Sequence, residues 1–243
     1  MAPGLTVRRT SLTVRQDNGA LPPTRLIVRQ DRSHRPAGPM AHPVSPSRRT
    51  NLSVRQDNDA MTIPRFGRLQ LQVPSTDLLG PTVAAALTGW SGSPLYVAPI
   101  DPALSDTAAF CEHYDVPMAA SANCVIVTGK RGGLQRWAAA VVLATTRADV
   151  NGLIRRRLDV RKVSFADTAA AVELTGMEYG GITPIGLPGH WPILVDHAVV
   201  DAGPVIIGSG IRASKILVDG AALALLPGAE VIDGLARTAD SSD

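Results

Sequence analysis

Apolar positions divide this chain into two parts with different patterns. Across residues 1–60 no spacing of 3.6 or 2.0 residues is sustained, whereas from Ser75 onwards apolar residues recur at helical spacing or form short strand-like runs. The second part therefore has the pattern of a folded domain. The pattern predicts helices that end near residue 87, begin at 106 and cover 150–158, 167–174 and 221–226, and strands over 93–100, 123–127, 138–145, 204–208 and 216–218.

The helix that begins at residue 106 has a clear apolar face. Thr107, Phe110, Cys111 and Tyr114 recur at i, i+3, i+4 and i+7, so we expect Cys111 to be a core residue. His113 belongs to another face, because residues two positions apart do not face each other on a helix. A nucleophilic Cys–His pair is the alternative that this spacing disfavours.

Two strands are predicted to form a hairpin. Residues 123–127 and 138–145 are joined by the glycine-rich turn 129–133. The predicted strands and helices alternate without the regular rhythm of a parallel sheet. The predicted fold class is therefore mixed α/β, with a curled mixed β-sheet around a pocket and flanking helices.

The stretch 175–186 contains four glycines and one proline between two patterned segments. Gly180 and Gly181 permit close approach of another chain segment or a ligand, and Pro184 restrains Thr183. Such a loop can present fixed amide groups to an oxyanion, or it can be a tight corner between two elements. Both readings remain open at this point.

A second glycine motif, Gly208-Ser-Gly-Ile-Arg-Ala213, follows the strand 204–208 and formally matches a dinucleotide-binding fingerprint, with Glu230 about twenty residues further on. Only 33 residues follow Gly210, and a strand and turn occupy the place of the required helix. We therefore interpret it as a corner that closes the pocket opposite the first loop.

Other polar residues leave alternatives open. Asp196 lies in an apolar run, so its carboxylate is either at a strand end in water or turned into a pocket to bind substrate. The basic residues of 155–162 form either a solvated face or a contact with an RNA backbone. His190 and His197 are not at metal-ligand spacing, so no metal site is expected.

Charge and composition concern mainly the first sixty residues. They contain ten Arg and four Asp, several prolines and three copies of Val-Arg-Gln-Asp, and they predict a disordered tail. A nucleic-acid-binding arm is the alternative, and a gene start set too early, with Met61 opening the protein, is another. Two cysteines and no long apolar run predict a cytoplasmic protein with neither membrane nor DNA as a partner.

The glycine loop resembles the signature loop of the YbaK-type aminoacyl-tRNA deacylases, relatives of the editing domain associated with prolyl-tRNA synthetase. The similarity extends over about residues 106–232 and includes the strand 123–127 and the turn at 208–212. One difference is that Asn123 occupies the position of the family's functional lysine. The resemblance implies a domain over residues 61–243 that hydrolyses mischarged aminoacyl-tRNA, binds its acceptor end without a cofactor, and has an aminoacyl-tRNA synthetase as a further candidate partner.

The expected site combines the two glycine motifs. The loop residues expected to act in catalysis are Gly180, Gly181, Thr183, Pro184 and Gly186. The residues expected to bind substrate are Asn123, Thr175, Asp196, Gly208, Ser209, Gly210 and Arg212. The alternative function is a family member that has lost catalysis and binds an aminoacyl-adenosine-like ligand without turnover; a nucleotide-dependent oxidoreductase, resting on the dinucleotide fingerprint, is the third hypothesis.

Overall fold

The computed structural model describes residues 63–238, which all lie in the compact unit Asp57–Asp243. The predicted tail, residues 1–60, lies outside the described residues. The helices are α1 (Pro81–Leu87), α2 (Thr107–Tyr114), α3 (Arg155–Arg157), α4 (Thr168–Thr175), α5 (His197–Val200) and α6 (Gly220–Leu223), with short 3₁₀ turns at Thr76–Leu78, Pro102–Leu104 and Met118–Ala120 and a π-type turn at Val150–Ile154.

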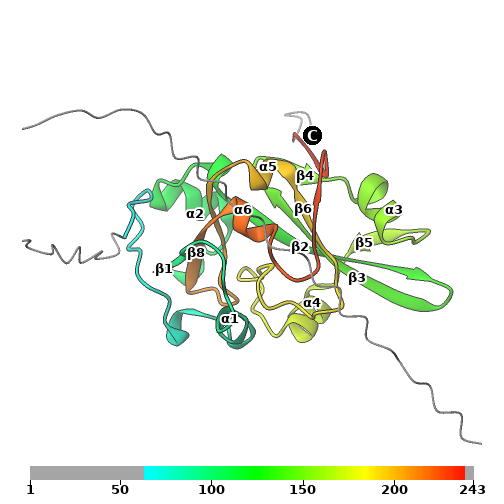
Figure 1. The fold of residues 1–243 in the computed structure, drawn as a ribbon, viewed down its shortest axis with the longest axis horizontal. Helices are drawn as coiled ribbons and strands as arrows, with labels where there is room; N and C mark the ends of the chain where they lie inside the picture. Colours follow the sequence, from blue (N-terminus) through cyan, green and yellow to red (C-terminus); the bar gives the residue numbers. More distant parts are fainter. Residues whose placement is uncertain (1–62, 239–243) are drawn as a thin grey trace, which may run out of the picture. The chain divides into compact units, whose positions relative to one another are not determined.

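Ten strands complete the described part of the chain (Figure 1). They are β1 (Tyr96–Pro99), β2 (Ala122–Arg131), β3 (Leu134–Leu143), β4 (Thr146–Ala148), β5 (Val163–Phe165), β6 (Ile193–Asp196), β7 (Pro204–Gly208), β8 (Ser214–Asp219), β9 (Ala229–Ile232) and β10 (Ala236–Thr238).

The largest sheet has five strands in the order β5-β2-β3-β6-β9. β2 pairs antiparallel with β3 and β5, whereas β6 pairs parallel with β3 and β9, so this sheet is mixed. The long β2–β3 hairpin turns at Gly132 and Gly133, which both have positive φ. This confirms the predicted hairpin, although both strands extend further towards the turn than the apolar pattern indicates.

A second sheet is antiparallel, with the order β1-β8-β7. A parallel bridge between Ser121, just before β2, and Ile206 of β7 joins it to the five-stranded sheet. The predicted mixed α/β fold is confirmed; the sheet is not closed, and its strands divide into this three-stranded sheet, the five-stranded mixed sheet and a small β4–β10 pair. The junction matters for function because it places β2 and β8 around one space.

Aspartate caps start four helices. Asp106, Asp167, Asp196 and Asp219 each accept hydrogen bonds from amides in the first turn of α2, α4, α5 and α6. A side-chain oxygen at this position pairs with an amide that has no partner inside the helix. The caps at Asp106 and Asp167 agree with the sequence prediction, and Gly176 ends α4 in the left-handed region with φ 66°.

The predicted helix 150–158 is shorter and less regular than expected. Its first part is the π-type turn, capped by Asp149, and only Arg155–Arg157 is α-helical. Gly152 contributes to this, because a Cβ there would overlap the Asp149 carboxylate that caps the turn. The largest core cluster joins the two sheets and includes Val97, Val141, Val195, Ile207 and Ile216.

Candidate active site

A cavity of about 340 Å³ lies where the two sheets meet. The N-terminal end of α2, the start of β2, the end of β7, β8 and the glycine loop supply its walls. This volume is within the range of small-molecule sites. The lining residues are Ala103, Ser105, Asp106, Thr107, Phe110, Ser121, Ala122, Asn123, Cys124, Val125, Tyr179, Gly180, Ile182, Ile206, Ile207, Gly208, Arg212 and Lys215.

The glycine loop packs directly against the turn between β7 and β8. The Gly210 amide donates to the Gly181 carbonyl at 2.8 Å, and the Glu178 amide donates to the Gly210 carbonyl at 2.9 Å. A Cβ at Gly181 would lie 2.5 Å from the carbonyl oxygen of Ile211, and one at Gly208 would overlap the Gly181 carbonyl. These two glycines therefore permit backbone contact between the two corners. At Gly181 the loop is thus the tight corner that the sequence analysis gave as one of its two interpretations.

Gly180 and Ile182 are the parts of the loop that line the cavity. No acceptor within residues 63–238 pairs with the amide of either residue. The loop is thus a tight corner at Gly181, and the amides on either side of Gly181 have no acceptor among the described residues.

Arg212 ties the loop to the opposite wall. Its guanidinium donates to the carbonyl of Tyr179 at 3.1 Å and to that of Pro102 at 3.0 Å. Its amide donates to the Glu178 carboxylate at 2.7 Å. Arg212 therefore shapes the cavity as a clamp, and it adds positive charge to the lining.

Asn123 lies at the start of β2 and lines the same cavity. Its side-chain oxygen accepts a hydrogen bond from the hydroxyl of Thr107 at 2.8 Å. This bond orients the amide and leaves the two N–H groups of its nitrogen as donors. Asn123 contributes polarity to the cavity without charge.

Lys215 is a site residue that sequence reasoning missed. It lies on β8 opposite Gly208 of β7, only 7% of its surface is exposed, and it lines the cavity. Burial lowers its pKa, and the nearby Cys111 and Asp106 partly oppose this shift. The sequence did contain an indication of this site residue, because Lys215 is one of only three lysines in the chain and lies inside an apolar strand.

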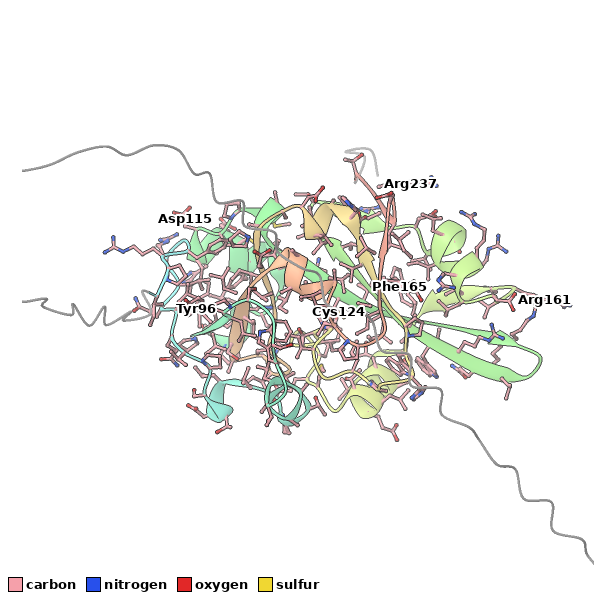
Figure 2. All side chains as sticks on the ribbon, viewed as in Figure 1. Tyr96, Asp115, Cys124, Arg161, Phe165 and Arg237 are labelled. Atoms are coloured by element: carbon pink, nitrogen blue, oxygen red, sulfur yellow. The ribbon has the colours of Figure 1, made fainter. Side chains whose placement is uncertain are left out.

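Cys124 also lines the cavity; it is half-buried, and Figure 2 labels it near the middle of the domain, whereas Arg161 is at its edge. Burial raises the pKa of its thiol to about 12. The nucleophilic form of cysteine is the thiolate, so Cys124 is present at neutral pH as an unreactive thiol. None of the histidines among residues 63–238 lines the cavity, so Cys124 also lacks a histidine base there.

The structure brings together four of the twelve predicted site residues in the cavity: Asn123, Gly180, Gly208 and Arg212. The other eight lie behind its wall or elsewhere. The Ser209 hydroxyl pairs with Ser214, Thr175 donates to the carbonyl of Ala171, and Thr183 is fully buried.

Pro184 and Gly186 line a second cavity, of about 370 Å³. Its walls are mainly apolar and come from the segments around Trp90 and Leu226 as well as the loop. The loop therefore contributes residues to both cavities. Among the described residues, charged side chains line the first cavity only.

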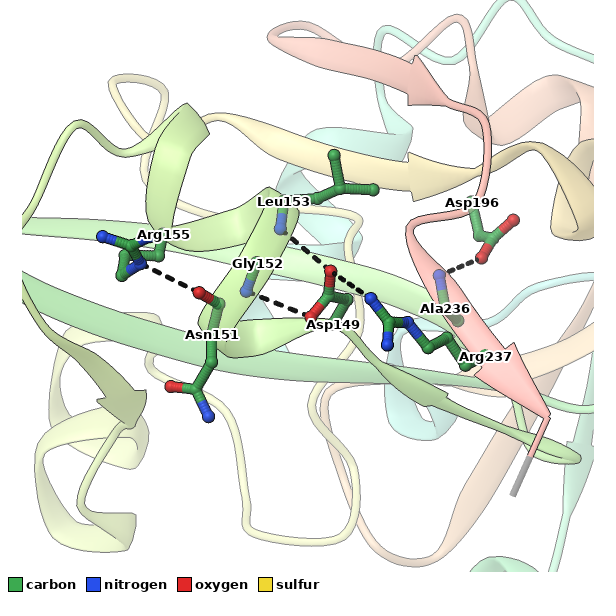
Figure 3. A network of polar contacts seen from close by, with 8 residues as sticks. All are labelled: Asp149, Asn151, Gly152, Leu153, Arg155, Asp196, Ala236 and Arg237. Carbon is green, nitrogen blue, oxygen red and sulfur yellow. Dashed lines mark hydrogen bonds and ion pairs between the residues drawn. The ribbon is translucent and has the colours of Figure 1, made fainter. Parts of the chain in front are cut away.

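Asp196 does not line the first cavity, and its carboxylate has a structural role. It is 5% exposed, and one oxygen caps α5 by accepting from Ala198 at 3.0 Å. The other accepts from the Ala236 amide of β10 at 2.6 Å (Figure 3). The alternative in which Asp196 turns into the substrate pocket is thus not the one that the fold adopts.

The described part of the chain contains no group of three or more His, Cys, Asp or Glu side chains placed to hold a metal ion. No helix between residues 63 and 238 is long and apolar enough to cross a membrane. Where the dinucleotide fingerprint would need a helix, Ser214–Asp219 forms β8. The turn at 208–213 is therefore a corner between antiparallel strands, as the sequence analysis predicts.

The fold and the cavity define a mixed α/β domain with a pocket whose charged lining residues are Asp106, Arg212 and Lys215. Residues 101–226 match the aminoacyl-tRNA editing domain, and the chain belongs to this family. The structure is similar to the crystal structure of a protein proposed as a trans-editing enzyme for prolyl tRNA synthetase, with a TM-score of 0.54, 20% identity and coverage of 64% of this chain and 97% of the other. A hypothetical protein of known structure gives a TM-score of 0.53 at 22% identity, with 63% and 97% coverage.

Proline–tRNA ligases are also similar over a short segment. Those of Listeria welshimeri and Listeria monocytogenes are 33% and 35% identical to this chain over 72 residues. The matched segment is 28% of this chain and spans only 13% of the length of those ligases.

Proposed function

We propose that this protein hydrolyses the ester bond of mischarged aminoacyl-tRNA and acts in trans, as a separate editing protein in translation quality control. One observation carries the proposal: every residue that lines the polar cavity lies within the segment, residues 101–226, that matches the editing domain. The cavity's volume of about 340 Å³ is within the range of small-molecule sites, and the side chains of Asn123, Arg212 and Lys215 add hydrogen-bond donors to its lining.

The chemistry rests on positioning. The amides of Gly180 and Ile182 are candidates to bind the ester carbonyl oxygen, whose negative charge grows as water adds to the carbon. The inactive thiol of Cys124 and the absence of histidine from the described cavity lining favour attack by water over a protein nucleophile. Holding ester and water in a reactive geometry can supply a large part of the rate enhancement.

A basic face supports the acceptor end of tRNA as the partner. We define this face as Lys130, Arg131, Arg136, Arg155, Arg156, Arg161 and Lys162, around the β2–β3 hairpin and α3. Residues 130–162 contain nine Lys and Arg against two Asp, whereas the rest of residues 63–238 contains five against thirteen Asp and Glu. Ion pairs from Arg131 and Arg136 to Asp159 hold the hairpin beside the end of α3.

The basic face lies far from the cavity along β2. Asn123 is near the start of this strand and Arg131 is its last residue, eight positions later. At about 3.3 Å per residue the two are roughly 26 Å apart. A ligand that reaches both must be extended, as the acceptor stem of tRNA is, and the basic face would then contact its phosphates.

Deacylation of a tRNA panel tests the proposal. The full chain is incubated with tRNA carrying Ala, Ser, Cys or the correct Pro ester, and the remaining ester is followed against an enzyme-free control. We expect at least one small mischarged ester to be hydrolysed at least tenfold faster than the control, with the correct ester spared. Equal rates with and without protein for all esters would refute hydrolysis.

The alternative function is a protein that binds the ligand without hydrolysing it. The observation that favours it is the neutral Asn123, which lies at the start of β2 and lines the cavity. The two functions are distinguished by measuring the binding of an amide-linked analogue, 3′-alanylamino-3′-deoxyadenosine, by calorimetry. Binding of this analogue together with no hydrolysis of any ester would establish the binder.

We also propose that residues 61–243 form the editing domain, that residues 1–60 are a separate tail, and that a prolyl-tRNA synthetase is a further partner. The local similarity to proline–tRNA ligases supports the last point. Deacylation by residues 61–243, compared with the full chain, tests the domain boundary. Sedimentation with the purified synthetase, with and without tRNA, tests the association.

A further inference from the structure

Lys215 is a buried cation whose hydrogen bonds are incompletely used. Its ammonium donates to the carbonyl of Ser105 at 3.0 Å and to that of Gly180 at 3.3 Å, and it lies 5.5 Å from the centre of the Phe110 ring. An ammonium has three N–H donors. Two are thus assigned within residues 63–238, and the third has no protein acceptor there.

The charge of Lys215 is also uncompensated at short range. Within the described residues no carboxylate lies within salt-bridge distance of its ammonium, and the Asp106 carboxylate in the cavity accepts from the amides of Ala108 and Ala109. A buried charge without a close counter-charge is costly. Such a cost is typical of groups placed for a ligand rather than for stability.

We propose that Lys215 is a catalytic residue whose ammonium donates its third hydrogen bond to the carbonyl oxygen of the bound ester. The inference rests on the proposed function and names the main electrostatic group of its site. The Gly180 carbonyl, which the ammonium contacts, belongs to a residue that lines the same cavity and whose amide has no acceptor within residues 63–238. Lys215 and the loop amide would therefore approach one oxygen from neighbouring positions.

The step is a hydrolysis in which Lys215 stays protonated. The oxygen of water forms a bond to the ester carbon, and negative charge on the carbonyl oxygen is stabilised by the ammonium. The bond from the carbon to the ribose oxygen then breaks. The proton from water ends on that ribose oxygen, so the products are the free amino acid and tRNA with a free terminal hydroxyl.

A purely structural role is the competing explanation, because Lys215 also links the carbonyls of Ser105 and Gly180. Lys215→Met removes the charge at similar length. Asn123→Lys restores one ammonium from β2, since position 123 lines the same cavity. We expect Lys215→Met to lower kcat/KM by about 100-fold or more, as loss of one oxyanion donor does. In the double variant Asn123→Lys, Lys215→Met we expect at least a tenfold recovery, which no repair of the Ser105–Gly180 link would give.

The outcomes of this experiment distinguish the proposed hydrolysis from the proposed role of Lys215. Activity of Lys215→Met within threefold of the wild type would overturn the role of Lys215 while leaving hydrolysis intact. If thermal unfolding shows that Lys215→Met does not fold, the role of Lys215 is tested by the pH dependence of kcat/KM in the wild type. A fall of kcat/KM on the alkaline side, below the usual pH range of lysine titration, supports the proposal, and a flat profile to pH 10.5 overturns it.

A wild type that hydrolyses no ester refutes the proposed function and leaves Lys215 to be judged by binding of 3′-alanylamino-3′-deoxyadenosine. Binding that weakens at least tenfold in Lys215→Met, or in wild type as pH rises through the alkaline range, supports contact with the ligand. Binding that is unchanged, or absent in the wild type, overturns it.

Discussion

The ammonium of Lys215 donates a hydrogen bond to the carbonyl oxygen of Gly180 at 3.3 Å, so a cation on β8 contacts the glycine loop directly. The loop and β8 are 35 residues apart in sequence at this contact. The contact places a charge beside the amide donors of the loop. It also makes the protonation state of one lysine matter both for folding and for the proposed chemistry.

Stability and activity are predicted to change in opposite directions with pH. Burial lowers the pKa of Lys215 in the folded state, whereas in the unfolded chain it is the ordinary value of about 10.4. Between these two values the unfolded chain binds more protons, so the free energy of unfolding rises with pH. Over the same window log kcat/KM falls by about one per pH unit, because the ammonium is lost.

Lys215→Met is the control for the stability half of this prediction. Chemical denaturation of both proteins is measured from pH 7 to 10.5, and the titrating groups that do not interact with Lys215 cancel in the difference; Cys111, Asp106 and Arg212 are the charged or titratable groups that do interact with it. The unfolding free energy of wild type relative to Lys215→Met should increase with pH. A difference that is constant or decreases would show that the folded-state pKa of Lys215 is not lowered.

Gly181→Ala is predicted to destabilise the fold. The new Cβ, whose position is fixed by the backbone of residue 181, would lie 2.5 Å from the backbone carbonyl oxygen of Ile211, so no side-chain rotation relieves the overlap. We expect a loss of about 2 kcal/mol or more in the free energy of unfolding, in the range of overpacked cores. Thermal and urea unfolding measure this directly.

Gly189→Ala is a matched control from the same connection between α4 and β6, because a Cβ there meets nothing within 4 Å. It should unfold within about 0.5 kcal/mol of wild type. If Gly181→Ala were as stable as Gly189→Ala but inactive, Gly181 would act in the chemistry, and its role as a packing glycine would be wrong.

The local sequence signals predict much of the fold. Asp106 and Asp167 mark helix starts, Gly176 marks a helix end, and the apolar runs locate β2, β3 and β7. These features depend on residues close in sequence. The division into two sheets depends on the bridge between Ser121 and Ile206, which no local pattern encodes.

The candidate site was only partly predictable for the same reason. Glycine spacing identifies two corners, but it does not tell which glycine faces a ligand and which faces backbone, as Gly180 and Gly181 show. Asp196 and Lys215 are both buried polar residues in apolar strands. Only the tertiary neighbours distinguish them, because two amides satisfy the carboxylate of Asp196 and the cavity leaves one donor of Lys215 free.

Asp196→Ala is predicted to lower stability without changing the site. It would leave the amides of Ala198 and Ala236 without their acceptor, at a cost of about 2–4 kcal/mol for a cap and a buried donor together. Asp219→Ala is the control, because its exposed carboxylate caps only α6 and should cost about 1 kcal/mol. Both should keep wild-type kcat/KM at temperatures where they are folded; a tenfold loss in Asp196→Ala alone would return Asp196 to the substrate site.

The basic face is predicted to act on tRNA but not on small ligands. In the double variant Arg156→Gln, Arg161→Gln both lost charges are exposed, and neither forms an ion pair within residues 63–238. We expect weaker tRNA binding. The slope of log K against log salt should also decrease in magnitude by about one to two, because binding displaces fewer counterions when fewer phosphates are contacted. Affinity for 3′-alanylamino-3′-deoxyadenosine should be unchanged, because neither Arg156 nor Arg161 lines the cavity.

The matched control is Arg65→Gln, Arg68→Gln, which removes the same charge from an exposed segment that contacts the end of α2 instead of α3. Filter binding of uncharged tRNA from 50 to 300 mM salt measures both double variants. Equal effects in the two would mean that tRNA responds only to net charge, and the cations around α3 would then be a solvated surface. A loss confined to Arg156→Gln, Arg161→Gln would instead locate the acceptor stem on the basic face, with its terminal ester free to enter the cavity at the other end of β2.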